Sequence, residues 1–212
     1  MKLYILLFFS VCALSACSSL KVVPQQQANG TINLKDNSQT ITRENVLITV
    51  KNGDAEILSY NLDGSVASFF VIIDNQTDGE LQYDNDSFLL VDSDGRQYFP
   101  LTPDKVKEMV ARNTYYLIPY PYVGFYYLED YEKSTFNNRL TSDRPYFYEL
   151  YPQDIYTKAL PVGSIIPKAK VAGLVYFRID FQDKKAVNLM VYKKGSSKSA
   201  PADFDFPFKI VK

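Results

Sequence analysis

The sequence contains no histidine among its 212 residues. A chain without histidine has no Ser-His-Asp or Cys-His catalytic arrangement and no imidazole ligand for a metal. Catalysis could still use carboxylates, tyrosine or lysine. We therefore expect a protein that is not an enzyme, with carboxylate chemistry as the open alternative.

A strong charge of either sign is also missing, because 23 Lys and Arg residues face 24 Asp and Glu residues and leave a net charge of −1. Nucleic-acid binding requires a basic stripe, so we expect no nucleic-acid partner. The chain has no phosphate-binding loop, dinucleotide fingerprint or internal repeat. Its length allows one domain, or one domain with a sizeable insertion.

Long apolar runs are scarce, and the most apolar stretch is residues 3–11, which follow Lys2. It is shorter than the roughly 20 apolar residues that cross a bilayer. A positive start, a short apolar run and the small residues Ala13, Ser15 and Ala16 are typical of a secretory signal. We predict that residues 1–16 are a signal peptide.

The signal ends in Leu14-Ser15-Ala16-Cys17, which resembles the lipobox of bacterial lipoproteins. The resemblance implies thioether lipidation of Cys17, cleavage before it and a further, palmitate-type chain on the new amino group. Two or three acyl chains hold a protein on a membrane for practical purposes. Ser18 stands where an inner-membrane retention signal would usually show Asp, which by the same resemblance favours the outer membrane.

The two cysteines, Cys12 and Cys17, both belong to this segment. If Cys12 is removed and Cys17 is acylated, the mature chain has neither a free thiol nor a disulfide. Residues 18–43 are rich in Gln, Asn, Ser and Thr, so we predict that residues 17–43 are the lipidated cysteine and a flexible tether. Such a coil would place the domain about 25–30 Å from the membrane. Ile32 and Leu34 alternate with polar residues, so part of this segment could instead add an edge strand.

From residue 44 onward, apolar and polar residues alternate with the period of two that is typical of strands. The run at 66–73 is continuously apolar and predicts a central strand. Strands are expected at 46–50, 56–60, 66–73, 87–91, 97–101, 171–181, 187–191 and 204–210. Pro207 lacks an N–H, so the last of these should be an edge strand or leave that position unpaired.

Many short strands separated by turns predict a mainly β fold, an antiparallel β-sandwich at 44–212. The pattern resembles the immunoglobulin-like domains of many bacterial lipoproteins. The core Cys and Trp of antibody domains are absent, because the chain contains no Trp. The likeness is therefore one of architecture.

The predicted sandwich is interrupted by an insertion at about 102–165 that contains a helix and is rich in tyrosine. Pro103 is favourable in a first helical turn, and Val106, Met109 and Val110 share one helical face. Of the 17 tyrosines, most lie in this insertion. The candidate binding residues are Tyr115, Tyr116, Tyr120, Tyr122, Phe125, Tyr126 and Tyr127.

These rings have two interpretations. They could cover a sheet face as a second small core, because tyrosine is commonly half-buried. They could also form a binding surface for another envelope protein or a glycan, since tyrosine is enriched at interfaces. No basic residues are interleaved with the rings, which argues against single-stranded nucleic acid.

Two groups of acidic residues are candidates for a metal site or a catalytic pair. Asp84, Asp86, Asp92 and Asp94 resemble calcium ligands, but the final Glu of an EF-hand is missing and Asp94-Gly95 is typical of a hairpin turn. Glu129, Asp130 and Glu132 could supply a glycosidase pair, although sequence neighbours rarely flank one bond. We predict no metal, no cofactor and no catalytic residue.

Overall fold

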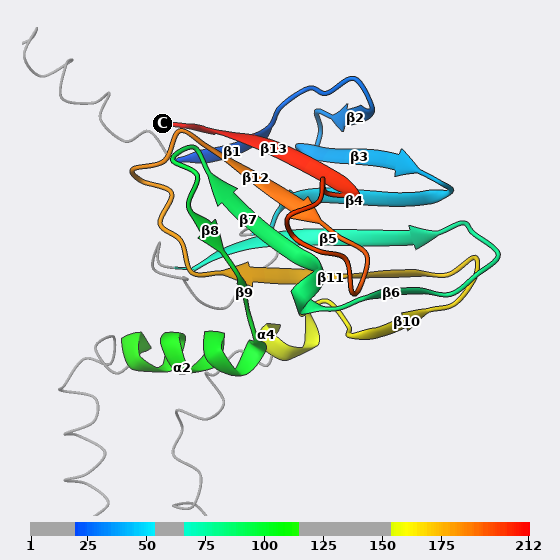
Figure 1. Cartoon of the computed structure of the whole chain (residues 1–212). Coiled ribbons are helices and arrows are strands. Elements are labelled where there is room, and N and C mark those ends of the chain that lie inside the picture. Colours follow the sequence, from blue (N-terminus) through cyan, green and yellow to red (C-terminus); the bar gives the residue numbers. More distant parts are fainter. Residues whose placement is uncertain (1–19, 54–65, 115–153) are drawn as a thin grey trace, which may run out of the picture.

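The structure is a computed structural model that describes residues 20–53, 66–114 and 154–212. These residues form two antiparallel sheets that face each other (Figure 1). The expected mainly β sandwich is therefore confirmed. The tyrosine-rich part of the insertion and the strand expected at 56–60 lie outside the described residues.

The first sheet has five strands in the order β1-β13-β12-β7-β8. Their bounds are β1 Lys21–Pro24, β13 Phe204–Val211, β12 Ala186–Val191, β7 Phe88–Asp92 and β8 Gln97–Tyr98. The strands with strict apolar alternation in the sequence, β12 and β13, lie in the middle of this sheet.

The second sheet has six strands in the order β2-β3-β4-β5-β11-β9. Their bounds are β2 Gly30–Asn33, β3 Ser38–Arg43, β4 Val46–Asn52, β5 Ala67–Asn75, β11 Lys170–Phe177 and β9 Pro100–Leu101. The continuously apolar run expected to be a central strand is β5, which pairs with β4 and β11.

Five further elements complete the described fold. Strands β6 Leu81–Tyr83 and β10 Gly163–Ile165 form a separate two-stranded sheet, and a 3-10 turn, η3 Asn85–Ser87, precedes β7. Helices α2 Pro103–Thr114 and α4 Asp154–Thr157 border the undescribed segment 115–153. The helix expected at Pro103 is confirmed. No helix in the described ranges is long and apolar enough to cross a membrane.

The main core lies between the two sheets and is built around Phe69 of β5. Its ring lies 5.2 Å from that of Phe208 on the opposite sheet and 6.0 Å, edge to face, from that of Phe177. Alternation explains this packing, because Phe204, Phe206 and Phe208 all point inward from β13 and are buried. Burying aromatic rings of this size is the largest contribution to the stability of such a core.

The flexible tether predicted for residues 17–43 is wrong for most of its length. Strands β1, β2 and β3 lie within it, and β1 and β3 contribute Val22 and Ile41 to the main core. The prediction failed because these strands are short and because β2 and β3 are mostly polar, although the edge strand allowed around Ile32 is present as β2. Gln39 is fully buried, yet its Nε2 donates to the carbonyl of Gln25 at 3.1 Å. The domain therefore begins at about residue 20 and not at 44.

The expectation that the strand containing Pro207 is a sheet edge is also wrong, because β13 is paired on both sides, with β1 and β12. The alternative, an unpaired nitrogen, fits the structure. The carbonyl of Pro207 accepts from the N–H of Gln25 at 2.8 Å, so the nitrogen of Pro207 faces the same flank. That position is one residue past the last β1–β13 pair, Pro24 with Phe208.

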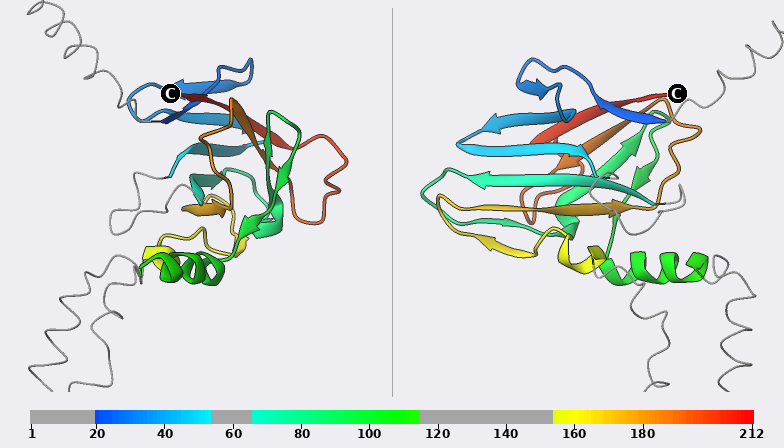
Figure 2. Two further views of the ribbon diagram at one scale, coloured as in Figure 1. Left: turned by 90° about the vertical axis from the view of Figure 1, so that its left-hand side faces the viewer. Right: turned by 180° about the vertical axis from the view of Figure 1, so that it is seen from behind.

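Helices α2 and α4 lie along one edge of the sandwich, on the side of β9 and β11, as all three views show (Figures 1 and 2). Strands β1, β2 and β3 lie on the opposite edge. The place where the chain enters the fold is thus separated by the full width of the sheets from the place where the insertion leaves it.

Candidate functional site

The residues predicted to carry function lie outside the described residues. This holds for the lipobox Leu14, Ser15 and Ala16, for the lipidation residue Cys17, and for the aromatic residues at 115–127. The structure does describe both ends of the insertion that carries these aromatic residues. We call α2 and α4 together the stem of the insertion.

The two helices of the stem lie side by side and are joined by side-chain contacts. The hydroxyl of Tyr156 in α4 donates to Oδ1 of Asp104 in α2 at 2.7 Å. This hydrogen bond to a carboxylate raises the pKa of Tyr156. Nζ of Lys107 lies 5.8 Å from the centre of the same ring. Helix α4 therefore lies beside the first turns of α2, and Thr114, from which the chain leaves, is about 15 Å further along the helix axis (Figure 1).

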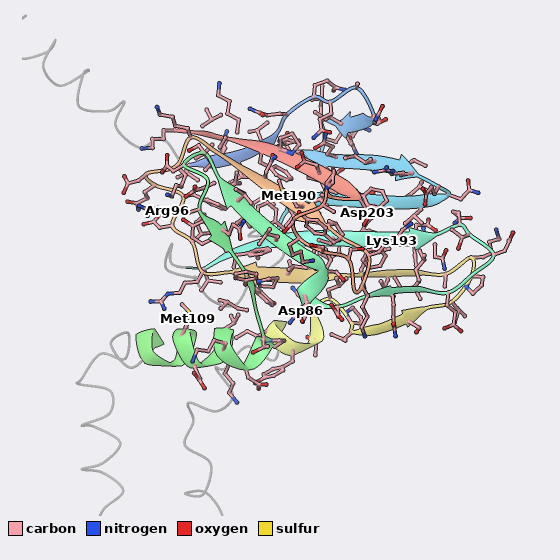
Figure 3. All side chains as sticks on the ribbon, viewed as in Figure 1. Asp86, Arg96, Met109, Met190, Lys193 and Asp203 are labelled. Atoms are coloured by element: carbon pink, nitrogen blue, oxygen red, sulfur yellow. The ribbon has the colours of Figure 1, made fainter. Side chains whose placement is uncertain are left out.

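Beneath the stem lies a small hydrophobic cluster that is separate from the main core. It consists of Val66, Val106, Ile155, Leu174 and Tyr176, with the partly buried Phe70, Leu101, Met109 and Ala159 packed against it. Figure 3 places Met109 on the side of α2 that faces the sheet. The outward face of β11 is thus covered by the stem, as the expected apolar face of the helix requires.

Hydrogen bonds fix the returning chain to β11. The N–H of Leu174 donates to the carbonyl of Lys158 at 2.6 Å, and the N–H of Leu160 donates to the carbonyl of Leu174 at 2.9 Å. Gly173 makes this approach possible, because a Cβ there would lie 2.5 Å from the nitrogen of Leu160. The stem is therefore held by the backbone as well as by its side chains.

A groove of about 380 Å³ lies at the other edge of the sandwich. It is lined by the β1–β2 connection, the end of β3 and the start of β13: Gln27, Asn29, Ile41, Thr42, Arg43, Ala202, Asp203, Phe204 and Asp205. Sequence reasoning missed it, because Gln27 and Arg43 were assigned to the tether. The available signal was Asp205, which alternates with the inward phenylalanines of β13.

Most polar groups of the groove already have partners. Nη1 of Arg43 donates to the carbonyl of Asp203 at 3.0 Å, and Oδ2 of Asp203 accepts from the N–H of Lys193 at 2.8 Å. Oδ1 of Asp205 is buried and has no hydrogen-bond partner among the described residues. Burial raises the pKa of Asp205. The groove thus offers one incompletely satisfied carboxyl group and not a pair.

A tyrosine near this groove also has an altered environment. Tyr83 is 3% exposed, and its hydroxyl has no partner within the described part of the chain. Burial raises its pKa to about 12, with a further contribution from the charges of Asp203 and Glu44. A phenol with this pKa remains protonated at neutral pH and is poorly suited to act as a general base.

One of the acidic residues considered as calcium ligands, Asp92, already has protein partners for both of its oxygens. Asp92 is buried, and its Oδ1 accepts from the N–H groups of Asp94 and Arg96, both at 2.9 Å. Its Oδ2 accepts from the hydroxyl of Tyr98 at 2.9 Å and lies 2.6 Å from Nζ of Lys184. Asp92 thus closes the expected turn. Within residues 20–53, 66–114 and 154–212, no three acidic or cysteine side chains are placed to hold a metal ion.

The pKa of Asp92 reflects two opposed effects. Burial alone would raise it, but Lys184 and the hydrogen bonds from Arg96, Tyr98 and Asp94 outweigh burial and hold the pKa far below its usual value. The same contact with Asp92 raises the pKa of Lys184. The pair is therefore fully ionised at neutral pH.

Comparison with known proteins gives no family for this chain. No protein-family model matches it, and no curated protein matches its sequence. A solved structure of a presumed lipoprotein from Bacillus subtilis is 14% identical with a TM-score of 0.41, over 87% of this chain and 39% of its own length. This chain therefore spans well under half of that protein.

A second solved structure, the secreted protein MPT63 of Mycobacterium tuberculosis, is 14% identical with a TM-score of 0.33. The match covers 76% of this chain and 90% of MPT63. Structural similarity at these TM-scores gives no information about the function of this chain.

Proposed function

We propose that the protein is an envelope lipoprotein, anchored through acylated Cys17 and acting as a non-catalytic module for protein interaction or assembly. Its aromatic insertion is the proposed contact surface, and the outer membrane is its proposed location. The anchor is supported by the apolar leader and by Leu14-Ser15-Ala16-Cys17.

The stem is the observation that carries the interaction proposal. Segment 115–153 contains Tyr115, Tyr116, Tyr120, Tyr122, Phe125, Tyr126 and Tyr127. The helices that precede and follow this segment are joined by the hydrogen bond between Asp104, in the first turn of α2, and Tyr156 in α4, and they rest on a hydrophobic cluster of their own. An aromatic segment held at both ends by a rigid scaffold is a common arrangement for binding residues. The stem lies on the edge of the sandwich opposite β1, the strand nearest to Cys17 in the sequence.

A crosslinking pull-down from native envelopes tests the contact surface. Substituting Tyr120, Tyr122 and Tyr126 together with Ala should abolish recovery of the partner and leave the melting temperature nearly unchanged. The matched control replaces Leu34 and Ile166, which are 85% and 60% exposed, with Ala and should keep the partner. A large loss of stability in the tyrosine variant would instead assign these rings to a second core.

The anchor is tested separately by mass spectrometry of the mature protein. The proposal expects a chain that begins at Cys17 and carries a diacylglyceryl group and an amide-linked acyl chain. An unmodified thiol at position 17 or an uncut leader would refute the lipid anchor but would not bear on the proposed contact surface.

A small-ligand or glycan module is the second candidate, with the same aromatic residues as its binding surface. The groove beside Asp205, on the opposite edge of the sandwich, is a separate candidate ligand site, because its volume of about 380 Å³ is within the range of ligand pockets. Isothermal titration with peptidoglycan fragments and envelope oligosaccharides tests this candidate. A heat of binding that is lost when Tyr120, Tyr122 and Tyr126 are substituted would favour a small-ligand or glycan module over a protein-interaction module.

A further inference from the structure

The distance from the proposed anchor to the folded domain is set by very few residues. Residues 18–20 are all that separate Cys17 from Lys21, the first residue of β1. Four residue steps span at most about 14 Å even when fully extended. This limit follows from covalent geometry alone.

Strand β1 is held firmly, so the chain beyond residue 20 cannot lengthen this connection. All four of its residues pair with β13, from Lys21 with Val211 to Pro24 with Phe208. Val22 is 5% exposed in the main core, and Leu20 packs against the same core. After β1, Nε2 of Gln27 donates to the carbonyl of Asp205 at 2.8 Å.

The headgroup layer takes up much of the available length. The hydrocarbon core of a bilayer is about 30 Å thick and the whole bilayer about 40–45 Å, so each polar layer is about 5–8 Å thick. The acyl chains of Cys17 begin at the inner side of this layer. Lys21 therefore lies within about 6–9 Å of the headgroup surface, which is about one Debye length at physiological ionic strength.

The end of the sandwich that contains Lys21 carries further exposed lysines. Lys209 pairs with Val23 and Ala186, and the carbonyl of Lys185 accepts from the N–H of Ile210. We call Lys21, Lys185, Lys209 and Lys212, all exposed, the anchor-proximal lysines. None of them forms an ion pair within the described residues. In Figure 1 the marked C-terminus lies beside the start of β1.

Acidic residues at this end occupy the connections between strands and not the β1–β13 pair. Asp94 lies in the β7–β8 turn beside Lys184, and Asp180 and Asp183 lie between β11 and β12. Arg96 adds a positive charge in the same turn as Asp94 (Figure 3). Lys21, Lys209 and Lys212 thus lie at the β1–β13 pair, where the chain enters from the anchor, and Lys185 lies in the connection that also carries Asp180 and Asp183.

We propose that this end of the sandwich rests directly on the phospholipid headgroups, with the anchor-proximal lysines against anionic lipid. The inference relies on the lipidation of Cys17 under the proposed function and adds the orientation of the domain. The sandwich is then held at the membrane surface, in place of the distance of about 25–30 Å that a flexible tether would allow.

The test uses the full lipidated protein in vesicles of phosphatidylcholine with about one third phosphatidylglycerol. A fluorophore is attached to a single introduced cysteine, which is unique because Cys12 is removed and Cys17 is acylated. Gln182→Cys reports on the anchor-proximal end, and Ser196→Cys, on the exposed β12–β13 turn, reports on the opposite end. A nitroxide on the lipid headgroup is the quencher.

The proposal expects severalfold stronger quenching at position 182 than at position 196. Equal quenching at both positions, in protein that floats with the vesicles, would overturn it. Protein that fails to float with the vesicles would instead refute the lipid anchor, so the two failures are distinguishable.

Two variants separate the short connection from the charge. A Gly/Ser linker of about twelve residues between Leu20 and Lys21 adds about 20 Å of reach and should abolish the difference on purely phosphatidylcholine vesicles. On anionic vesicles the same variant should keep part of the difference in quenching between positions 182 and 196, because each lysine near such a surface contributes about a fivefold gain in affinity.

Adding Lys21→Gln, Lys185→Gln, Lys209→Gln and Lys212→Gln to the linker variant should then remove the remaining difference. Quenching that does not depend on these lysines would overturn the assignment of anionic lipid as their partner. Quenching that is unchanged by the linker on neutral vesicles would overturn the role of the short connection.

Discussion

Nζ of Lys184 lies 2.6 Å from Oδ2 of Asp92, and the two side chains are 11% and 0% exposed. The same carboxylate accepts hydrogen bonds from Asp94, Arg96 and Tyr98. A buried carboxylate with this many donors connects the β7–β8 turn to the connection before β12. It contributes to stability and leaves no oxygen lone pair directed to a ligand.

Replacing this carboxylate should be costly. Asp92→Asn keeps the shape of the side chain but loses its charge, and hydrogen bonds to charged groups are worth about 1.5–3 kcal/mol. We expect the free energy of unfolding in urea to fall by about 2–3 kcal/mol. Asp94→Asn, in the same turn and 64% exposed, is the control and should stay within about 0.5 kcal/mol of the parent. Equal effects would contradict the role of Asp92.

The contribution of Asp92 should depend on pH in one direction. Its pKa is lower in the folded chain than its usual value of 3.8, so the ionised form stabilises the fold. The contribution is complete above the unfolded value and is lost as the pH falls through the folded pKa. The stability difference between the parent and Asp92→Asn should therefore be constant above about pH 5 and shrink below about pH 4. A difference that grows with acid would reverse the assignment.

Asp205 should show the opposite pH dependence. Burial raises its pKa in the folded chain, so the ionised form destabilises the fold above the folded pKa, and this penalty is absent below the unfolded value. Asp205→Asn should raise the melting temperature at pH 7 by about 2 °C, since the group is only half-buried and largely screened. The gain should vanish in acid. Differential scanning calorimetry at both pH values is the measurement.

Gly173→Ala should destabilise the protein through a direct collision. The new Cβ would lie 2.5 Å from the nitrogen of Leu160 and 2.6 Å from the carbonyl carbon of Ala159. Backbone atoms cannot move aside cheaply, so we expect a loss of about 2–3 kcal/mol in the free energy of unfolding. Gly79→Ala, whose Cβ would meet nothing within 4 Å, is the control. A tolerated Gly173→Ala would mean that residues 158–160 do not rest on β11.

Val22→Ala tests whether β1 belongs to the fold. Val22 is 5% exposed, and removing two buried methyl groups should cost about 1.5–2.5 kcal/mol. Lys21→Ala, next to it and exposed, should change the unfolding free energy by less than about 0.5 kcal/mol. A neutral Val22→Ala would restore residues 21–24 to a tether.

The strands that could be predicted are those in which the pattern of apolar residues in the sequence matches the pattern of buried residues in the structure. The continuously apolar run at 66–73 corresponds to the central strand β5. The runs at 187–191 and 204–210 correspond to β12 and β13, because strict apolar alternation leaves a strand one possible inward face. The helix at Pro103 was predictable for the same reason, since Val106 is fully buried.

The strands that could not be predicted bury polar groups. Gln39 and Ser38 are 0% and 6% exposed in β3. Polar residues of this kind indicate a linker when only the sequence is considered, because their hydrogen-bond partners are not known. Oγ1 of Thr40 lies 2.8 Å from Oγ1 of Thr49 on β4. Pairings of this kind depend on residues far away in sequence. The groove at Asp205 was missed for the same reason, because its walls come from opposite ends of the chain.

The stem has a consequence for how the chain can change. Because α4 contacts the first turn of α2 through Asp104 and Tyr156 and both helices rest on their own cluster, the helices on either side of segment 115–153 are held by described residues alone. We therefore expect changes in the length or sequence of this segment to leave the pairing of the described strands unchanged.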